Sequence, residues 1–177
     1  ANLSIEEGQP EKAMEPLRSA IAVFEKEKAD PPASSAYTNL SRALLLTGKT
    51  EEARVAIERA LKLGSTSSDP ALELPASIQK ALVDAAPGTP ASNPAAALQT
   101  LRKVSADAKR LGYYNLECEA RLALAEQQMR TNSAQTRPQL AALAADAHSR
   151  GFTLIARRAE NSLTSTGNTL AVNHSAH

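Results

Sequence analysis

Residues 34–63 read SSAYTNLSRALLLTGKTEEARVAIERALKL and contain two helical patterns separated by a turn at Gly48 and Lys49. A helix repeats every ~3.6 residues, so positions three, four and seven apart share one face. Such stripes are formed by Tyr37, Leu40 and Leu44 in the first half and by Ala53, Ile57 and Ala60 in the second. The segment therefore predicts two antiparallel helices.

Small side chains mark the expected contact between these two helices. Ser41 and Ala53 allow the backbones to approach closely, and Leu44 and Ile57 fill the remaining space. At the ends of the second helix, we expect Thr50 to be the N-cap and Gly64 to stop the helix in a left-handed conformation. An ordinary helical hairpin of an unrelated bundle could show the same features, so that alternative stays open.

The order of these residues resembles the tetratricopeptide repeat. That repeat has an aromatic, a Leu, a small and a large residue on its first helix, a turn Gly, and then Ala, a large residue and Ala on its second helix. The matching residues here are Tyr37, Leu40, Ser41, Leu44, Gly48, Ala53, Ile57 and Ala60. The resemblance implies an all-α fold, a right-handed α-solenoid of antiparallel helix pairs.

The composition favours the all-α class and excludes several functions. Aromatic residues make up 3% of the 177 residues, and runs of strand-forming residues are missing. The formal net charge is +1 with acids and bases interspersed along the chain, which gives no case for binding nucleic acid or an anionic membrane. No run approaches the ~18 apolar residues of a membrane span. Without export features, we expect a cytoplasmic location.

The repeat pattern extends over nearly the whole chain. The small residue that opens each second helix recurs as Ala13, Ala53, Ala97 and Thr136, roughly 40 residues apart, which is longer than the ~34 residues of the shortest repeats. The predicted segments are a truncated repeat at 1–33, a second repeat at 34–67, a divergent third at 68–112 with a long mobile loop at 86–93, a fourth at 113–151, a capping helix at 152–163 and a disordered tail at 164–177. Because the chain begins within a repeat, we expect it to be a piece of a longer protein.

Prolines set the expected helix boundaries. Pro16 falls inside a predicted helix and should kink it. Residues 29–33 (ADPPA) are expected to form a break before the second repeat. Asp69 and Pro70 predict a helix start, but Pro75 conflicts with a continuous helix and offers a later start. A further helix is expected to restart at Asn93 and Pro94 and to end at Gly112.

Residues 108–158 carry a second resemblance. The phrases AKRLGYYNLECEARLALAEQQMR and LAALAADAHSRGFTLIAR resemble the C-terminal repeats that bacterial multidomain regulators carry behind a kinase or a winged-helix DNA-binding module. This resemblance implies a part in signalling or transcriptional regulation.

Catalytic, cofactor and metal sites are not expected. His174 and His177 lie in the predicted tail without a nearby carboxylate or Cys, and His148 is expected to face solvent at a helix end. The single cysteine, Cys118, has no disulfide partner and should pack as a small apolar side chain. No Gly-rich phosphate loop and no nucleophile motif is present. We therefore predict a protein that is not an enzyme.

The resemblance to the repeat family implies a ligand groove on the first helix of each pair. In the second repeat the groove residues are Ser35, Thr38, Asn39, Arg42 and Leu45, and the corresponding residues elsewhere are Asn2, Lys80 and Arg121. An asparagine amide can donate to and accept from a peptide backbone, and the cations can pair with carboxylates. One family subtype grips a C-terminal carboxylate with two asparagines, but Glu73 and Ser77 occupy its third-repeat basic positions, so this binding is not expected.

Two functions from different classes remain. The first is a scaffold module within a bacterial regulator that binds a protein or peptide segment through the groove, without contacting nucleic acid or membrane. The second is a structural module that docks against other domains of its own protein or forms a homo-oligomer. A basic groove that senses a small anionic ligand is a more distant third.

Overall fold

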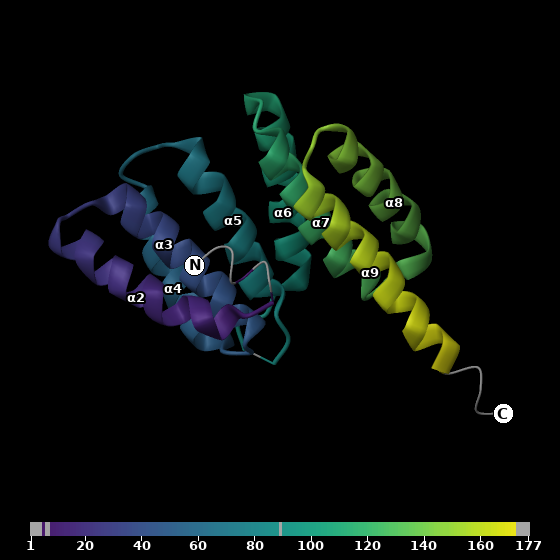
Figure 1. Ribbon diagram of the computed structural model, residues 1–177, viewed down its shortest axis with the longest axis horizontal. Helices are drawn as coiled ribbons and strands as arrows, with labels where there is room; N and C mark the ends of the chain where they lie inside the picture. Colours follow the sequence, from purple (N-terminus) through teal and green to yellow (C-terminus); the bar gives the residue numbers. More distant parts are fainter. Residues whose placement is uncertain (1–4, 6–7, 89, 173–177) are drawn as a thin grey trace. The chain divides into compact units, whose positions relative to one another are not determined.

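The computed structural model describes residue 5, residues 8–88 and residues 90–172, with side chains up to Thr164. The described residues form α-helices joined by short turns and loops, and none of them lies in a β-strand (Figure 1). The predicted all-α class is therefore confirmed. None of the described helices combines the length and apolar character needed to cross a bilayer.

The helices divide between two compact units, residues 1–100 and residues 101–177, with the boundary inside α6. The helices are α2 (Pro10–Lys26), α3 (Asp30–Leu46), α4 (Thr50–Gly64), α5 (Pro70–Ala85), α6 (Pro94–Leu111), α7 (Tyr114–Met129), α8 (Ser133–Ser149) and α9 (Thr153–Val172). The expected restart at Pro94 is confirmed, and the Asn93 side chain accepts a hydrogen bond from the Ala96 N–H at 3.1 Å.

Two proline predictions are corrected. Residues 29–33 are not a break, because α3 already begins at Asp30 and the prolines that follow occupy its first turn, where no N–H is needed. Helix α5 does not begin at Pro75 but runs from Pro70 through that residue. Its start is fixed by Asp69, whose side chain accepts from the Ala71 N–H at 2.9 Å. Pro16 lies inside α2, as predicted.

The predicted ends of α4 are also wrong. Thr50 is the first residue of the helix, not its N-cap. The N-cap is Lys49, whose side chain makes no capping hydrogen bond. Gly64 is the last helical residue and does not have a left-handed conformation. A Cβ atom at Gly64 would lie 3.0 Å from Ser34 Oγ, so this glycine permits a close approach between α4 and α3.

The C-terminal helix is longer than the sequence indicates. Helix α9 continues to Val172, past the predicted boundary at residue 163. The segment contains no proline, so the backbone hydrogen bonds of the helix can continue through its Ser and Thr residues. The rest of the predicted disordered tail, residues 173–177, lies outside the described residues.

Helices α3 and α4 are joined by two matching hydrogen bonds. Ser34 Oγ donates to the carbonyl oxygen of Ala60, and Ser41 Oγ donates to that of Ala53, both at 2.8 Å. Both serines are buried, and the pairs run in opposite order along the two helices. The helices are therefore antiparallel and close enough for side chains to reach the opposite backbone, which confirms the predicted role of the small residues.

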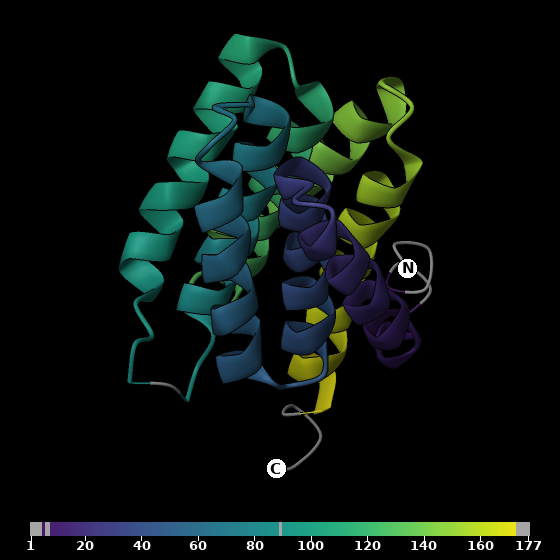
Figure 2. The same ribbon diagram turned by 90° about the vertical axis from the view of Figure 1, so that its left-hand side faces the viewer.

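Alternate helices of the N-terminal unit also lie side by side (Figure 2). The buried Gln79 of α5 donates from Nε2 to Ser41 Oγ of α3 at 3.2 Å. Helices α2 and α4 are joined by the ion pairs Arg18–Glu52 at 3.3 Å and Glu25–Arg59 at 3.0 Å. Helices α3 and α5 thus form one layer, and α2 and α4 form a second.

The C-terminal unit repeats this contact scheme with α7, α8 and α9. Its core contains Leu122 of α7, Leu140 of α8 and Ala156 of α9, together with the buried Cys118. Helices α7 and α9 are joined through Glu126, which accepts a hydrogen bond from Ser162 Oγ at 3.2 Å and pairs with Arg158 at 3.5 Å. Cys118 therefore packs as an apolar residue, as predicted.

The contact through Ser41 can be tested by mutation. Ser41→Ala is expected to lower the free energy of unfolding by about 1–3 kcal/mol, because it leaves the buried Gln79 amide without this partner. Ser41→Ala combined with Gln79→Leu should recover part of the loss. Urea unfolding followed by circular dichroism measures both values. The exposed control Ser19→Ala should change the free energy of unfolding by less than about 0.5 kcal/mol. If Ser41→Ala changes it no more than this control does, the contact with Gln79 does not stabilise the fold.

Candidate partner-binding surface

One face of α3 is covered only in part by the described residues. Ser35, Asn39, Arg42 and Leu46 follow one another at helical spacing and form what we call the α3 stripe. Ser35 and Leu46 are exposed, and Asn39 and Arg42 are half-buried. The opposite side of α3 carries the buried Ser34, Leu40, Ser41 and Leu44. The stripe is thus a surface backed by the core.

The α3 stripe combines three kinds of chemistry. The Asn39 amide forms no hydrogen bond with any residue in the described part of the chain, so its donor and acceptor remain available. Arg42 adds a planar guanidinium that matches carboxylate geometry. Leu46 is 59% exposed and offers apolar area at the end of the helix. This set suits a peptide segment, whose backbone needs donors and acceptors and whose side chains need apolar or charged contacts.

The structure adds Leu46 to the residues predicted for this surface. Leu45, which the sequence indicated, packs against the core and is half-buried. Thr38 Oγ1 donates to the Ser34 carbonyl oxygen at 3.0 Å, so its hydroxyl is occupied within the helix. Leu46 lies seven residues after Asn39, a spacing that could have identified it. Asn2 lies outside the described residues.

Lys80 belongs to an ion-pair cluster at the contact between α4 and α5. Its ammonium lies 2.6 Å from the Asp84 carboxylate, which Arg54 of α4 also approaches at 3.1 Å. This cation therefore has a fixed partner within the N-terminal unit, and a ligand would have to compete for it.

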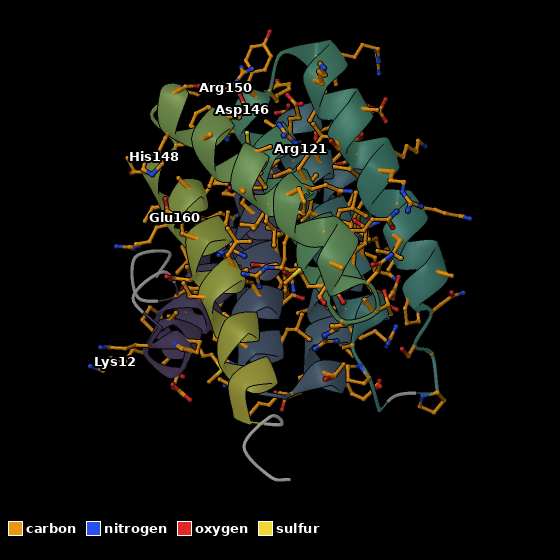
Figure 3. All side chains as sticks on the ribbon, turned by 90° about the vertical axis from the view of Figure 1, so that its right-hand side faces the viewer. Lys12, Arg121, Asp146, His148, Arg150 and Glu160 are labelled. Atoms are coloured by element: carbon orange, nitrogen blue, oxygen red, sulfur yellow. The ribbon has the colours of Figure 1, made fainter. Side chains whose placement is uncertain are left out.

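Arg121 lies in the C-terminal unit and is also paired. Its Nη1 lies 2.6 Å from Asp146 Oδ2, while Arg150 Nε lies 2.8 Å from the other oxygen of the same carboxylate. Figure 3 shows the three side chains converging from α7 and from the end of α8. The Arg150 guanidinium also stacks on the Tyr114 ring, 4.7 Å from its centroid. Hydrogen bonds from Arg150 and from Arg121 hold the pKa of Asp146 below its ordinary value of 3.8.

A cavity of about 320 Å³ opens between α3, α4 and α5 in the N-terminal unit. Its lining residues are Ser34, Ala60, Leu61, Gly64, Ser65, Leu72, Glu73, Ala76 and Ser77. Ser34, at its floor, is already bonded to the Ala60 carbonyl oxygen. Glu73 is the one charged residue of this lining and is exposed. The cavity is large enough for a side chain of a bound partner.

The described cysteine is buried in the core, and the described histidine contacts a carboxylate. Burial raises the pKa of the Cys118 thiol, which keeps it protonated. His148 Nε2 lies 3.1 Å from Glu160 of α9, a pair that the sequence did not indicate (Figure 3). No three His, Cys, Asp or Glu residues of the described part gather in a way that could hold a metal ion.

Comparison of this chain with protein-family models, with curated proteins and with solved structures gives no match.

The paired Asp146 should make stability depend on pH. Because the folded-state pKa is depressed, the contribution of Asp146 is fully present above its ordinary value of 3.8 and is lost as the pH falls through the folded value. Asp146→Asn is therefore expected to lower the urea midpoint at neutral pH. The midpoint of this variant should also fall less than that of the wild type as the pH is lowered into the acid range. Asp107→Asn, which removes only the pair with Arg110 within α6, is the control. A wild-type pH profile for Asp146→Asn would contradict this assignment.

Proposed function

We propose that this chain is a non-catalytic scaffold module that binds a protein or peptide segment through the α3 stripe. The observation that carries the proposal is the stripe itself. Helix α3 contacts α2, α4 and α5, yet it keeps Leu46 59% exposed and the Asn39 amide without a partner among the described residues.

The contacts between alternate helices support a repeat architecture of the tetratricopeptide kind. Helices α3 and α5 are joined in the N-terminal unit through Gln79, and α7 and α9 are joined in the C-terminal unit through Glu126. In a right-handed α-solenoid, the first helix of each pair lines the ligand surface, and within the N-terminal unit this is the position of α3 and α5. The serine-to-carbonyl bonds supply the close packing that such helix pairs require.

The proposed ligand is a segment that presents its backbone to Asn39. An acidic side chain of the ligand would meet Arg42, and an apolar one would cover Leu46. The resemblance of residues 108–158 to bacterial regulators extends the proposal to a module of a larger signalling or transcriptional regulator in the cytoplasm. Lys80 and Arg121 each already have a carboxylate partner, and Arg42 also takes part in an interaction within the chain, so a ligand would have to compete for each of these cations.

Self-association is the second candidate. Val23 of α2 is 51% exposed and Val55 of α4 is 68% exposed, so the layer opposite α3 and α5 presents apolar side chains to solvent. Burial of such side chains between two copies would stabilise a dimer. Light scattering over a wide concentration range measures the molar mass in solution. A mass that grows with concentration supports self-association, and the mass of a monomer at every concentration excludes it.

The ligand proposal is tested with peptides selected from a random library on the wild-type chain. Asn39→Ala combined with Arg42→Ala should weaken binding of the selected peptides by about tenfold or more, because both side chains would contact the ligand. Fluorescence anisotropy of labelled peptides measures the affinity, and circular dichroism confirms that the helices are retained.

The matched control removes the same two residue types from exposed positions elsewhere. Asn115 and Arg130 lie in the C-terminal unit, so Asn115→Ala combined with Arg130→Ala should leave the affinity unchanged. If the variant of the α3 stripe binds the selected peptides as tightly as this control, the stripe is not the ligand surface.

A further inference from the structure

The part of α6 that belongs to the C-terminal unit has one buried and one exposed face. Leu101, Val104 and Ala108 are 5% exposed or less and form the buried face. The exposed face carries Arg102, Lys103, Ala106, Lys109 and Arg110, which we call the α6 basic face. Nitrogen-tipped side chains project outward along α6 in Figure 3.

Most of the charge on the α6 basic face lacks a partner among the described residues. Arg110 pairs with Asp107 at 3.2 Å. Arg102, Lys103 and Lys109 form no ion pair with any residue that the structure describes. The sequence of residues 101–177 contains ten Lys and Arg against six Asp and Glu, so the whole segment has an excess of positive charge. Like charges gathered on one face favour an anionic partner.

The spacing of the cations indicates what shape that partner has. Arg102 and Lys109 form one row, and Lys103 and Arg110 form a second. The members of each row are seven residues apart, which is about 10.5 Å along a helix. Between the rows lies Ala106, whose methyl group permits close approach. A second helix lying along α6 could place carboxylates at the same seven-residue spacing against both rows, as charged residues do at the edges of coiled coils.

We propose that the α6 basic face binds an acidic α-helix with Asp or Glu residues at seven-residue spacing. The two regular rows of cations favour an acidic protein helix over nucleic acid, and the face has no aromatic side chain on which a base could stack. The proposal is independent of the α3 stripe, since it uses other residues on another helix.

The test uses the full chain and a synthetic helical peptide of about three heptads, with glutamates in two rows and alanine between them. Binding measured by isothermal titration calorimetry should weaken steeply as salt is raised from about 0.1 M to about 1 M. The variant Arg102→Glu, Lys103→Glu, Lys109→Glu and Arg110→Glu should lose about tenfold or more in affinity, because the exposed pairs act together.

The matched control reverses the charge of four exposed lysines in the N-terminal unit. Its substitutions are Lys12→Glu, Lys26→Glu, Lys28→Glu and Lys49→Glu. It changes the net charge by the same amount and should lose much less affinity. A scrambled peptide with irregular glutamate spacing should bind more weakly than the designed one. Equal binding of the two peptides, equal losses in the two variants, or tighter binding of duplex DNA than of the peptide would each overturn the proposal.

Discussion

The close approach of α3 to α4 is the constraint on which the N-terminal unit depends. Two buried serines of α3 donate to alanine carbonyl oxygens of α4, and these bonds fix both the register and the distance of the helices. Larger side chains at Ala53, Ala60 or Gly64 would separate the helices. Because Ser41 also accepts from Gln79, the same contact fixes α5 against α3. The orientation of α3, and thus of its exposed stripe, follows from this arrangement.

The fold separates charges that are mixed along the sequence. Acids and bases alternate throughout the chain, so the sequence indicated no charged surface. In the folded chain, many carboxylates pair with cations inside each unit, as Asp84 does with Lys80 and Asp146 with Arg121. Three cations without such a partner among the described residues, Arg102, Lys103 and Lys109, lie on the exposed side of α6. The net charge of the chain therefore says little about the charge of any one face.

Much of the helical architecture could be predicted from the sequence, because the apolar period and the small residues act locally. The pairing of Ser41 with Ala53 followed from side-chain size. The ends of α4 could not be predicted, because Gly64 serves a tertiary contact with Ser34 rather than a turn. The Lys80–Asp84 pair joins residues four apart on one helix and could have been predicted, whereas Asp146 becomes a neighbour of Arg121 only when α7 packs against α8. The residues of the α3 stripe were predicted in part: Ser35, Asn39 and Arg42 were named, and Leu46 was missed.

Helix α3 is held from several sides and presents a preformed surface. Native-state hydrogen exchange of the free chain, read by mass spectrometry, tests this arrangement most directly. We expect amides of residues 40–46 to exchange only with unfolding of the N-terminal unit, and Ser41→Ala to speed exchange in α3, α4 and α5 together. Fast exchange of α3 by local opening, while α4 and α5 stay protected, would contradict the account.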